Sequence, residues 1–140
     1  MILFDSSVVI DARDSSSPFH DWAKRQIAAA VQDGAEGGSV NTIVVSEASV
    51  RAEHPDAVPA LLEGLGLELV PLPISAAIPA AKAFAAYLDR LKKDGRKTEK
   101  RLPLPDFLIG AHAEAAGMKL VTRDPDRVKT YFPEVQLITP

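Results

Sequence analysis

Short apolar runs alternate along the chain with segments whose apolar residues recur at helical spacing, and this alternation constrains the fold more than any other feature. Continuous apolar runs are typical of strands in a parallel sheet covered on both faces, and helical spacing marks the segments that cross between them. Strands are predicted at residues 1–5, 38–42, 67–70, 118–122 and 135–138. Helices are predicted at residues 18–31, 43–53, 56–64, 75–93, 105–117 and 125–131, with no element assigned to residues 6–16. The alternation predicts an α/β fold of parallel strands joined through helices.

The size and composition of the chain restrict its class further. The 140 residues, 46% of them hydrophobic, suffice for one core, and we expect a single domain spanning residues 1–140. Because the chain has no cysteine, a disulfide framework and a thiolate metal site are excluded, and a bound metal needs oxygen or imidazole ligands. The sequence has neither a signal-peptide pattern at its start nor a membrane-spanning stretch, so we expect a soluble, cytoplasmic protein with no membrane partner.

Positive charge is concentrated in one segment of this acidic chain. The formal net charge is -3, whereas residues 90–101 read RLKKDGRKTEKR. Lysine and arginine supply the sequence-independent part of affinity for a nucleic-acid backbone. A solvated helix end also explains such a run, but its position before the predicted helix at 105–117 favours RNA contact. The candidate RNA-binding residues are Lys92, Lys93, Arg96 and Lys97.

Four acidic residues lie at positions where the predicted fold would bring them together. Asp5 ends the first strand and Asp124 follows the fourth, so both belong at the edge where ligand sites form in open α/β sheets. Asp106 lies in the first turn of a helix, and Glu47 lies on a largely apolar helix after the second strand. Two carboxylates 4 Å apart repel each other by about 4 kcal/mol at an effective dielectric constant of 20. A cluster of four therefore requires cations.

The chemistry of this cluster indicates a hard divalent cation. All the candidate ligand atoms are oxygens, with no accompanying sulfur or histidine, which favours Mg²⁺ or Mn²⁺. Such an ion at a phosphodiester lowers the pKa of a bound water and stabilises the leaving oxygen, so hydrolysis needs no nucleophilic side chain. Each acid taken alone has a simpler explanation, as a loop residue, a helix N-terminal acid or a solvated helix residue. The interpretation as a catalytic, metal-binding site depends on the set.

Four segments carry a similarity to a known family. They are residues 3–7 (LFDSS), 40–47 (VNTIVVSE), 104–113 (LPDFLIGAHA) and 120–125 (LVTRDP). In order and spacing they resemble the PIN-domain nucleases, and specifically the VapC-type toxins of bacterial toxin–antitoxin pairs. The similarity extends to the C-terminus and so covers nearly the whole chain.

The resemblance implies a fold, an activity and partners. The fold would be a three-layer α/β/α sandwich around a mostly parallel five-stranded sheet, and the activity would be Mg²⁺- or Mn²⁺-dependent cleavage of RNA. The residues that match the family's acidic quartet are Asp5, Glu47, Asp106 and Asp124. Ser7 stands where the family has Asn, Ser or Thr, a polar residue that helps order the metal-bound water. Family members usually form homodimers and are silenced by a cognate antitoxin, so we expect an RNA substrate, an antitoxin and a second copy as partners.

Three further residues near the quartet are secondary candidates. Thr122 and Arg123 are expected to position phosphate or carboxylate groups beside the last acid of the quartet. A strand-end arginine in solvent is an equally good interpretation of Arg123. Asp126 could assist a metal through a water molecule, although its place near a helix start explains it nearly as well.

Other function classes are compatible with acids at the ends of strands. A phospho-acceptor receiver domain shares the doubly wound sheet, but receivers have an adjacent pair of acids after the first strand, and here Asp5 is followed by two serines. A haloacid-dehalogenase-like phosphatase would need two aspartates two positions apart, where this chain has Asp5 and Ser7. A non-enzymatic, antitoxin-binding scaffold is the remaining alternative, and the intact quartet argues against it.

Overall fold

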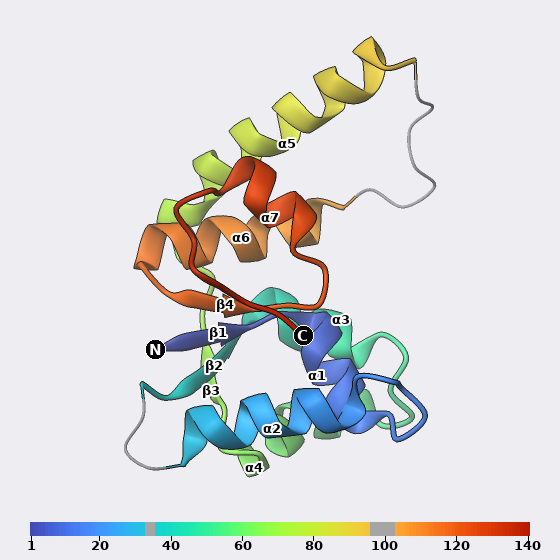
Figure 1. Cartoon of the computed structure of the whole chain (residues 1–140). Helices are drawn as coiled ribbons and strands as arrows, with labels where there is room; N and C mark the ends of the chain where they lie inside the picture. The colour runs from blue at the N-terminus through green and yellow to red at the C-terminus, as the bar shows by residue number, and fades with distance from the viewer. Residues whose placement is uncertain (33–35, 96–102) are drawn as a thin grey trace.

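Five strands form one parallel sheet in the computed structural model of the chain, which describes residues 1–32, 36–95 and 103–140 (Figure 1). The strands are β1 (Ile2–Phe4), β2 (Gly38–Asn41), β3 (Glu68–Val70), β4 (Lys119–Val121) and β5 (Leu137–Ile138). Their order in the sheet is β3-β2-β1-β4-β5, and every neighbouring pair is parallel. The predicted α/β class and the five-stranded sheet are confirmed.

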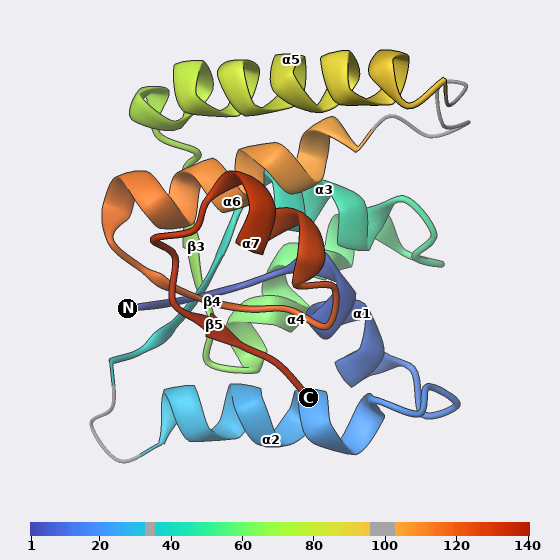
Figure 2. The ribbon, with the colours of Figure 1, turned by 45° about the horizontal axis from the view of Figure 1, so that its top comes forward.

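Helices cover both faces of this sheet. They are α1 (Ser6–Arg13), α2 (His20–Val31), α3 (Thr42–Ser49), α4 (Val58–Gly64), α5 (Ala77–Lys93), α6 (Leu104–Ala116) and α7 (Asp126–Tyr131), with short 3-10 turns at Pro55–Ala57 and Ile74–Ala76. Figure 2 shows α5 and α6 on one side of the sheet and α2 on the other. The three-layer arrangement is therefore confirmed. None of the helices in the described ranges is long and apolar enough to cross a bilayer.

Two helices differ from the sequence prediction. α1 occupies a segment with no predicted element, because its apolar stretch is too short to show a helical period, yet its Val8 and Val9 are fully buried. α3 ends at Ser49 rather than at residue 53. The residue that follows, Val50, is 78% exposed, and a helix this short depends on buried contacts to extend.

The order in which the strands are laid down reverses between β1 and β4. From β1 the chain builds outward through β2 to β3, and it then returns to add β4 and β5 on the other side. Phe4 lies opposite Val121 in the register, and the Asp5 amide donates to the Val121 carbonyl oxygen at 2.9 Å. Ligands bind outside the carboxyl ends of the strands at such a reversal. The residues that follow β1 and β4 are therefore placed where a site forms.

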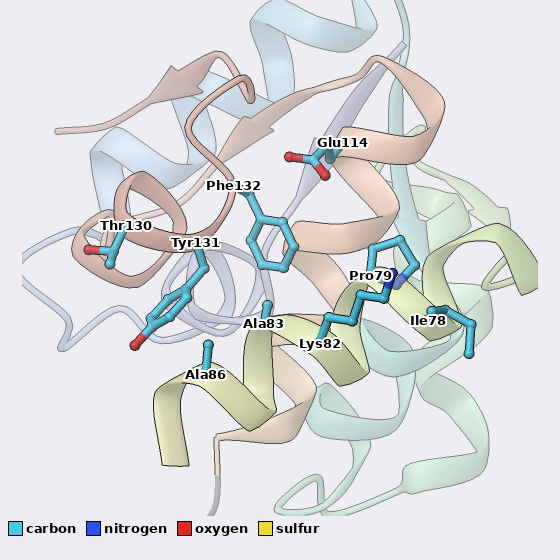
Figure 3. A pocket seen from close by; sticks show the side chains of 9 residues that line it. All are labelled: Ile78, Pro79, Lys82, Ala83, Ala86, Glu114, Thr130, Tyr131 and Phe132. Carbon is cyan, nitrogen blue, oxygen red and sulfur yellow. The ribbon is translucent and has the colours of Figure 1, made fainter. Parts of the chain in front are cut away.

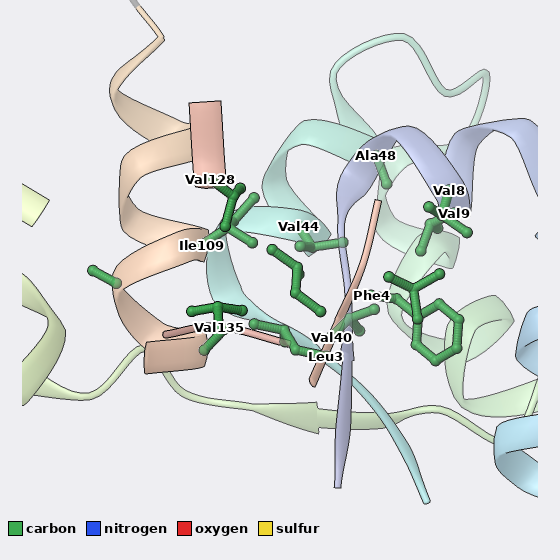
Figure 4. Close-up of a cluster of buried hydrophobic side chains, with 14 of the residues drawn as sticks. Leu3, Phe4, Val8, Val9, Val40, Val44, Ala48, Ile109, Val128 and Val135 are labelled. Carbon is green, nitrogen blue, oxygen red and sulfur yellow. The ribbon is translucent and has the colours of Figure 1, made fainter. Parts of the chain in front are cut away.

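An apolar core joins the sheet to the helices above and below it (Figure 4). Residues at the centre of the sheet, such as Phe4, are fully buried. Gly110 lets α6 approach Phe132 closely, because a Cβ at Gly110 would lie only 2.6 Å from that ring. α6 ends at Ala116, and the Gly117 that follows adopts the left-handed conformation with φ of 62°, as the glycine in the sequence predicts. These contacts fix the helix that carries Asp106.

Candidate active site

Asp5 caps the N-terminus of α1 directly after β1. Its Oδ1 accepts a hydrogen bond from the Ser6 amide at 2.8 Å. Its Oδ2 accepts from the Ser7 hydroxyl at 2.9 Å and from the Thr122 hydroxyl at 2.8 Å. Because both oxygens are held, the carboxylate has a fixed orientation. Ser7 thus contacts Asp5 directly, and its predicted role towards a metal-bound water stays a prediction.

Thr122 joins the two acids that follow β1 and β4. It is 1% exposed, and its Oγ1 donates to Asp5 while accepting from the backbone amide of Asp124 at 3.1 Å. A single hydroxyl therefore fixes the side chain of Asp5 and the backbone that carries Asp124. Thr122 therefore contacts one carboxylate of the quartet, and its predicted role towards a phosphate stays a prediction.

Ser6 joins Asp5 to the third acid. The Ser6 hydroxyl donates to Oε1 of Glu47 at 2.9 Å and lies 3.4 Å from Oδ1 of Asp5. Since the hydroxyl has one proton, the shorter contact is the stronger bond. This bond holds Glu47 of α3 at the start of α1, although Ser6 and Glu47 are 41 residues apart in the sequence. The sequence did not single out Ser6.

The orientation of α3 depends on a buried pair between Asn41 and His112. Asn41 caps α3 by accepting at Oδ1 from the Val44 amide at 3.0 Å, and its Nδ2 lies 3.1 Å from Nδ1 of His112 on α6. Burial lowers the pKa of His112, so the neutral ring can accept the amide proton at Nδ1. The pair ties α3, which carries Glu47, to α6, which carries Asp106.

Asp106 lies half-buried in the first turn of α6 and forms an ion pair that the sequence did not predict. Nη1 of Arg127, on α7, donates to Oδ2 of Asp106 at 2.5 Å. The Arg127 guanidinium also lies over two aromatic rings, 5.4 Å from the centroid of Tyr87 and 5.9 Å from that of Phe107. Such stacking holds an arginine in one place while its charge remains available.

The pKa shifts show that the acids lie within electrostatic range of one another. Burial is the main cause that raises the pKa of Asp5, and the charge of Asp106 raises it further against the effect of its hydrogen bonds. Burial likewise raises the pKa of Asp106. Glu47 and Asp124 add to that rise, and the Arg127 charge opposes it. The structure therefore brings the four predicted acids to one region at the strand reversal.

A cavity of about 570 Å³ opens beside Asp106 and Asp124, whereas Asp5 and Glu47 are not among its lining residues. Its lining includes Asp106, Asp124 and the secondary candidate Asp126. Three arginines, Arg90, Arg123 and Arg127, line the same cavity. Three carboxylates and three guanidiniums therefore line one cavity. Arg90 begins the basic segment predicted to contact RNA, whereas the sequence did not single out Arg127.

Arg123 is anchored rather than solvated. Its Nη1 donates to Oδ1 of the buried Asp11 at 3.1 Å, its Nε lies 3.7 Å from Oδ2 of Asp124, and its guanidinium lies 5.5 Å from the centroid of Phe19. Asp11 Oδ1 also accepts from the Ser17 hydroxyl at 2.9 Å, and Oδ2 has no hydrogen-bond partner in the described part of the chain. The solvent interpretation of Arg123 is therefore wrong, because a buried carboxylate needs a cation.

The predicted RNA-binding residues are described only in part. Lys92 and Lys93 are exposed in the last turn of α5. Arg96 and Lys97 lie outside the described residues. The proposed contact of this segment with RNA therefore stays a prediction.

A second hollow, of about 460 Å³, lies between α5, α6 and α7 (Figure 3). Apolar side chains such as Ile78, Pro79 and Phe132 line much of it, and its charged residues are Lys82 and Glu114. No member of the acidic quartet is among its lining residues. The cavity beside Asp106 is therefore the candidate active site.

The donor atoms of the quartet suit a hard divalent cation, but the side chains are not gathered as a finished site. Within residues 1–32, 36–95 and 103–140, no three acidic or histidine side chains are arranged so that they could hold a metal ion. Arg127 covers one oxygen of Asp106, and hydroxyl groups hold Oδ2 of Asp5. The ligand chemistry fits the predicted cation, and a side-chain rearrangement is needed to bind it.

Comparison with known proteins identifies the family. A family model for the PIN domain matches residues 2–133, and the chain therefore belongs to the PIN domain family. The family predicted from the four sequence segments is confirmed. No curated protein matches the chain in sequence.

Several solved structures share the fold along its whole length. DNA-bound VapBC from Salmonella typhimurium is 17% identical with a TM-score of 0.65, over 99% of this chain and 98% of that one. A toxin–antitoxin complex from Klebsiella pneumoniae is 20% identical with a TM-score of 0.62, over 100% and 98% of the two chains. VapC20 from Mycobacterium tuberculosis, a Sarcin-Ricin loop cleaving toxin, is 17% identical with a TM-score of 0.63, over 97% and 99%. At such identities the likeness establishes the fold.

Proposed function

We propose that this chain is a Mg²⁺- or Mn²⁺-dependent ribonuclease that hydrolyses RNA phosphodiester bonds and acts as the toxin of a toxin–antitoxin pair. The observation that carries the proposal is that Asp5, Glu47 and Asp124 all lie within electrostatic range of Asp106 near the strand reversal. Membership of the PIN domain family supports it, as does the likeness to toxin–antitoxin structures. The family membership also weighs against a receiver-like function.

The four carboxylates would hold the cation. Burial beside like charges disfavours the ionised form of Asp5 and Asp106, and a divalent cation would favour that form instead. When bound, Mg²⁺ or Mn²⁺ would supply a water of lowered pKa and stabilise the leaving oxygen. An oxygen-only donor set at the carboxyl edge of a parallel sheet is consistent with this chemistry.

The remaining residues of the site would orient the acids and the substrate. Ser7 and Thr122 hold Asp5 in one orientation, and Ser6 holds Glu47. Arg90 lines the cavity, where a guanidinium can bind a phosphate through two parallel hydrogen bonds.

Two further parts of the site are proposed from position and charge. Asp126 lines the same cavity, where it would contact the metal ion through a water molecule. The exposed Lys92 and Lys93, together with Arg96 and Lys97, would bind the RNA backbone.

The partners in this proposal are an RNA substrate, a cognate antitoxin and a second copy of the chain. VapBC and other toxin–antitoxin complexes are among the solved structures that share the fold, which supports the antitoxin. The alternative is a scaffold that binds an antitoxin without cleaving RNA. It predicts antitoxin binding with no nuclease activity at any metal concentration.

The test is RNA cleavage by the purified protein with Mg²⁺, with Mn²⁺ and with excess EDTA. Cleavage is expected only with the cation. Asp106→Asn should abolish it, whereas Asp21→Asn, which removes an exposed acid from the start of α2, should leave it unchanged. Cleavage that persists in EDTA, or an Asp106→Asn variant of full activity, would refute the metal mechanism. A folded wild-type protein with no cleavage under any condition would favour the scaffold.

A further inference from the structure

Arg127 forms an ion pair with a carboxylate that the proposed chemistry assigns to the metal ion. Its guanidinium donates to Oδ2 of Asp106, a carboxylate that a divalent cation held by the quartet would use. The Asp106 and Arg127 side chains are 42% and 30% exposed, so both partners can be reached from the cavity. Cation binding and this ion pair therefore compete for the negative charge of one carboxylate.

The surroundings of Arg127 keep it in the cavity after it leaves that carboxylate. Tyr87 and Phe107 lie beneath its guanidinium, and neither ring depends on Asp106 for its position, because both belong to an aromatic cluster with Phe84 and Tyr131. A stacked guanidinium can exchange one anionic partner for another by a small rotation about its side-chain bonds.

The anion that would replace Asp106 beside Arg127 is a phosphodiester of the bound substrate. Arg127 lines the same cavity as Asp106 and Asp124, so a phosphate placed against the acids through a cation lies within reach of the arginine. Guanidinium and phosphate form strong, charge-assisted hydrogen bonds. The net charge of the four acids exceeds what one arginine neutralises, so a cation still gains from entering.

Resting on the proposed function, we propose that Arg127 is a resident counter-ion that holds Asp106 while the site lacks metal and transfers to the substrate phosphate when a divalent cation takes that carboxylate. The chain thereby keeps its acidic pocket partly neutralised between reactions. Arg127 would both oppose metal binding and favour RNA binding. A purely structural ion pair would not give these opposite effects.

The experiment compares wild type with Arg127→Met, which keeps the aliphatic stem over the two rings, and with Lys129→Met as the charge control. Lys129 is exposed on the same helix, outside the cavity lining. Mn²⁺ is titrated into each RNA-free protein, and the free ion is followed by electron paramagnetic resonance. Arg127→Met should bind Mn²⁺ about tenfold more tightly than wild type, because a partly buried counter-ion is removed. Lys129→Met should stay within about twofold, since an exposed charge is screened.

The second measurement is the KM for a single-stranded RNA at saturating Mn²⁺, which should rise about tenfold in Arg127→Met because one charge-assisted phosphate contact is lost. Tighter metal with weaker RNA supports the exchange. Unchanged or weaker Mn²⁺ binding in Arg127→Met overturns it while leaving the proposed nuclease standing. Absence of Mn²⁺ binding in every protein overturns both. If Arg127→Met does not fold, Arg127→Lys decides: about threefold tighter Mn²⁺ and a raised KM are expected, because lysine loses the planar fork.

Discussion

Replacing Thr122 by valine tests the hydroxyl that joins the acids after β1 and β4. Valine keeps the shape of the side chain but removes its one donor and its acceptor. A hydrogen bond to a charged carboxylate contributes about 2 kcal/mol and a neutral one about 1 kcal/mol. Thr122 donates one bond to Asp5 and accepts one from the Asp124 amide. The free energy of unfolding should therefore fall by roughly 3 kcal/mol.

Urea unfolding of the metal-free protein at neutral pH measures this loss, with Thr122→Ser as the matched control. Serine keeps the hydroxyl and loses a buried methyl group, which costs about 1 kcal/mol. Valine should thus be the more damaging substitution although it fills the site better. Equal stability of Thr122→Val and wild type, or a serine variant as unstable as the valine variant, would refute the role given to the hydroxyl.

The pH dependence of the same loss gives an independent check. The ordinary pKa of an aspartate is 3.8, burial raises the pKa of Asp5 above it, and the Thr122 hydroxyl lowers it again. Without the hydroxyl, the folded-state pKa of Asp5 rises further. A raised pKa means that ionisation opposes folding: the penalty is absent below the unfolded value and complete above the folded one. The deficit of Thr122→Val should therefore be largest at neutral pH and shrink as the pH falls towards 3.8. A deficit that grows with acid would contradict this reasoning.

Three other outcomes are expected from urea unfolding of the metal-free protein. Arg123→Met should lower the free energy of unfolding by about 3 kcal/mol, because it leaves the Asp11 carboxylate buried without its cation. Adding Asp11→Leu should restore most of the lost stability. A double variant no more stable than Arg123→Met would count against the ion pair. Asn41→Ala should cost roughly 2 kcal/mol, because it removes both the cap of α3 and the partner of His112, and a cost below about 0.5 kcal/mol would show that the contact is weak. The stability of Asp106→Asn relative to wild type should increase as the pH rises from about 4 to 7, since the raised pKa of Asp106 makes its ionisation unfavourable for folding. With excess Mg²⁺, wild type should instead be the more stable of the two proteins.

The strands, and the places of Asp5 and Asp124 at their carboxyl ends, could be predicted because each has a local signal. Continuous apolar runs mark strands buried on both faces, and the end of such a run fixes the edge at which Asp5 and Asp124 lie. Asp106 and Glu47 were proposed because the sequence segments that contain them resemble those of the family. Their place near the other acids depends on α3 and α6, whose joint orientation rests on the pair between Asn41 and His112.

The contacts that tune the site had no such signal. Arg127 and Asp106 are 21 residues apart, and Arg123 and Asp11 are 112 apart, so no local pattern pairs them. α1 escaped prediction for a related reason. Its buried face includes Asp11, a charged residue that becomes compatible with burial only once Arg123 arrives from the far end of the chain.

The central position of β1 has a consequence for synthesis on the ribosome. Thr122 is synthesised 117 residues after its partner Asp5, and β4 must be inserted beside β1 before the two can meet. The pocket therefore stays unassembled while the residues between β1 and β4 are made. The topology of the sheet therefore delays completion of the pocket until β4 has been made. This delay needs no partner protein.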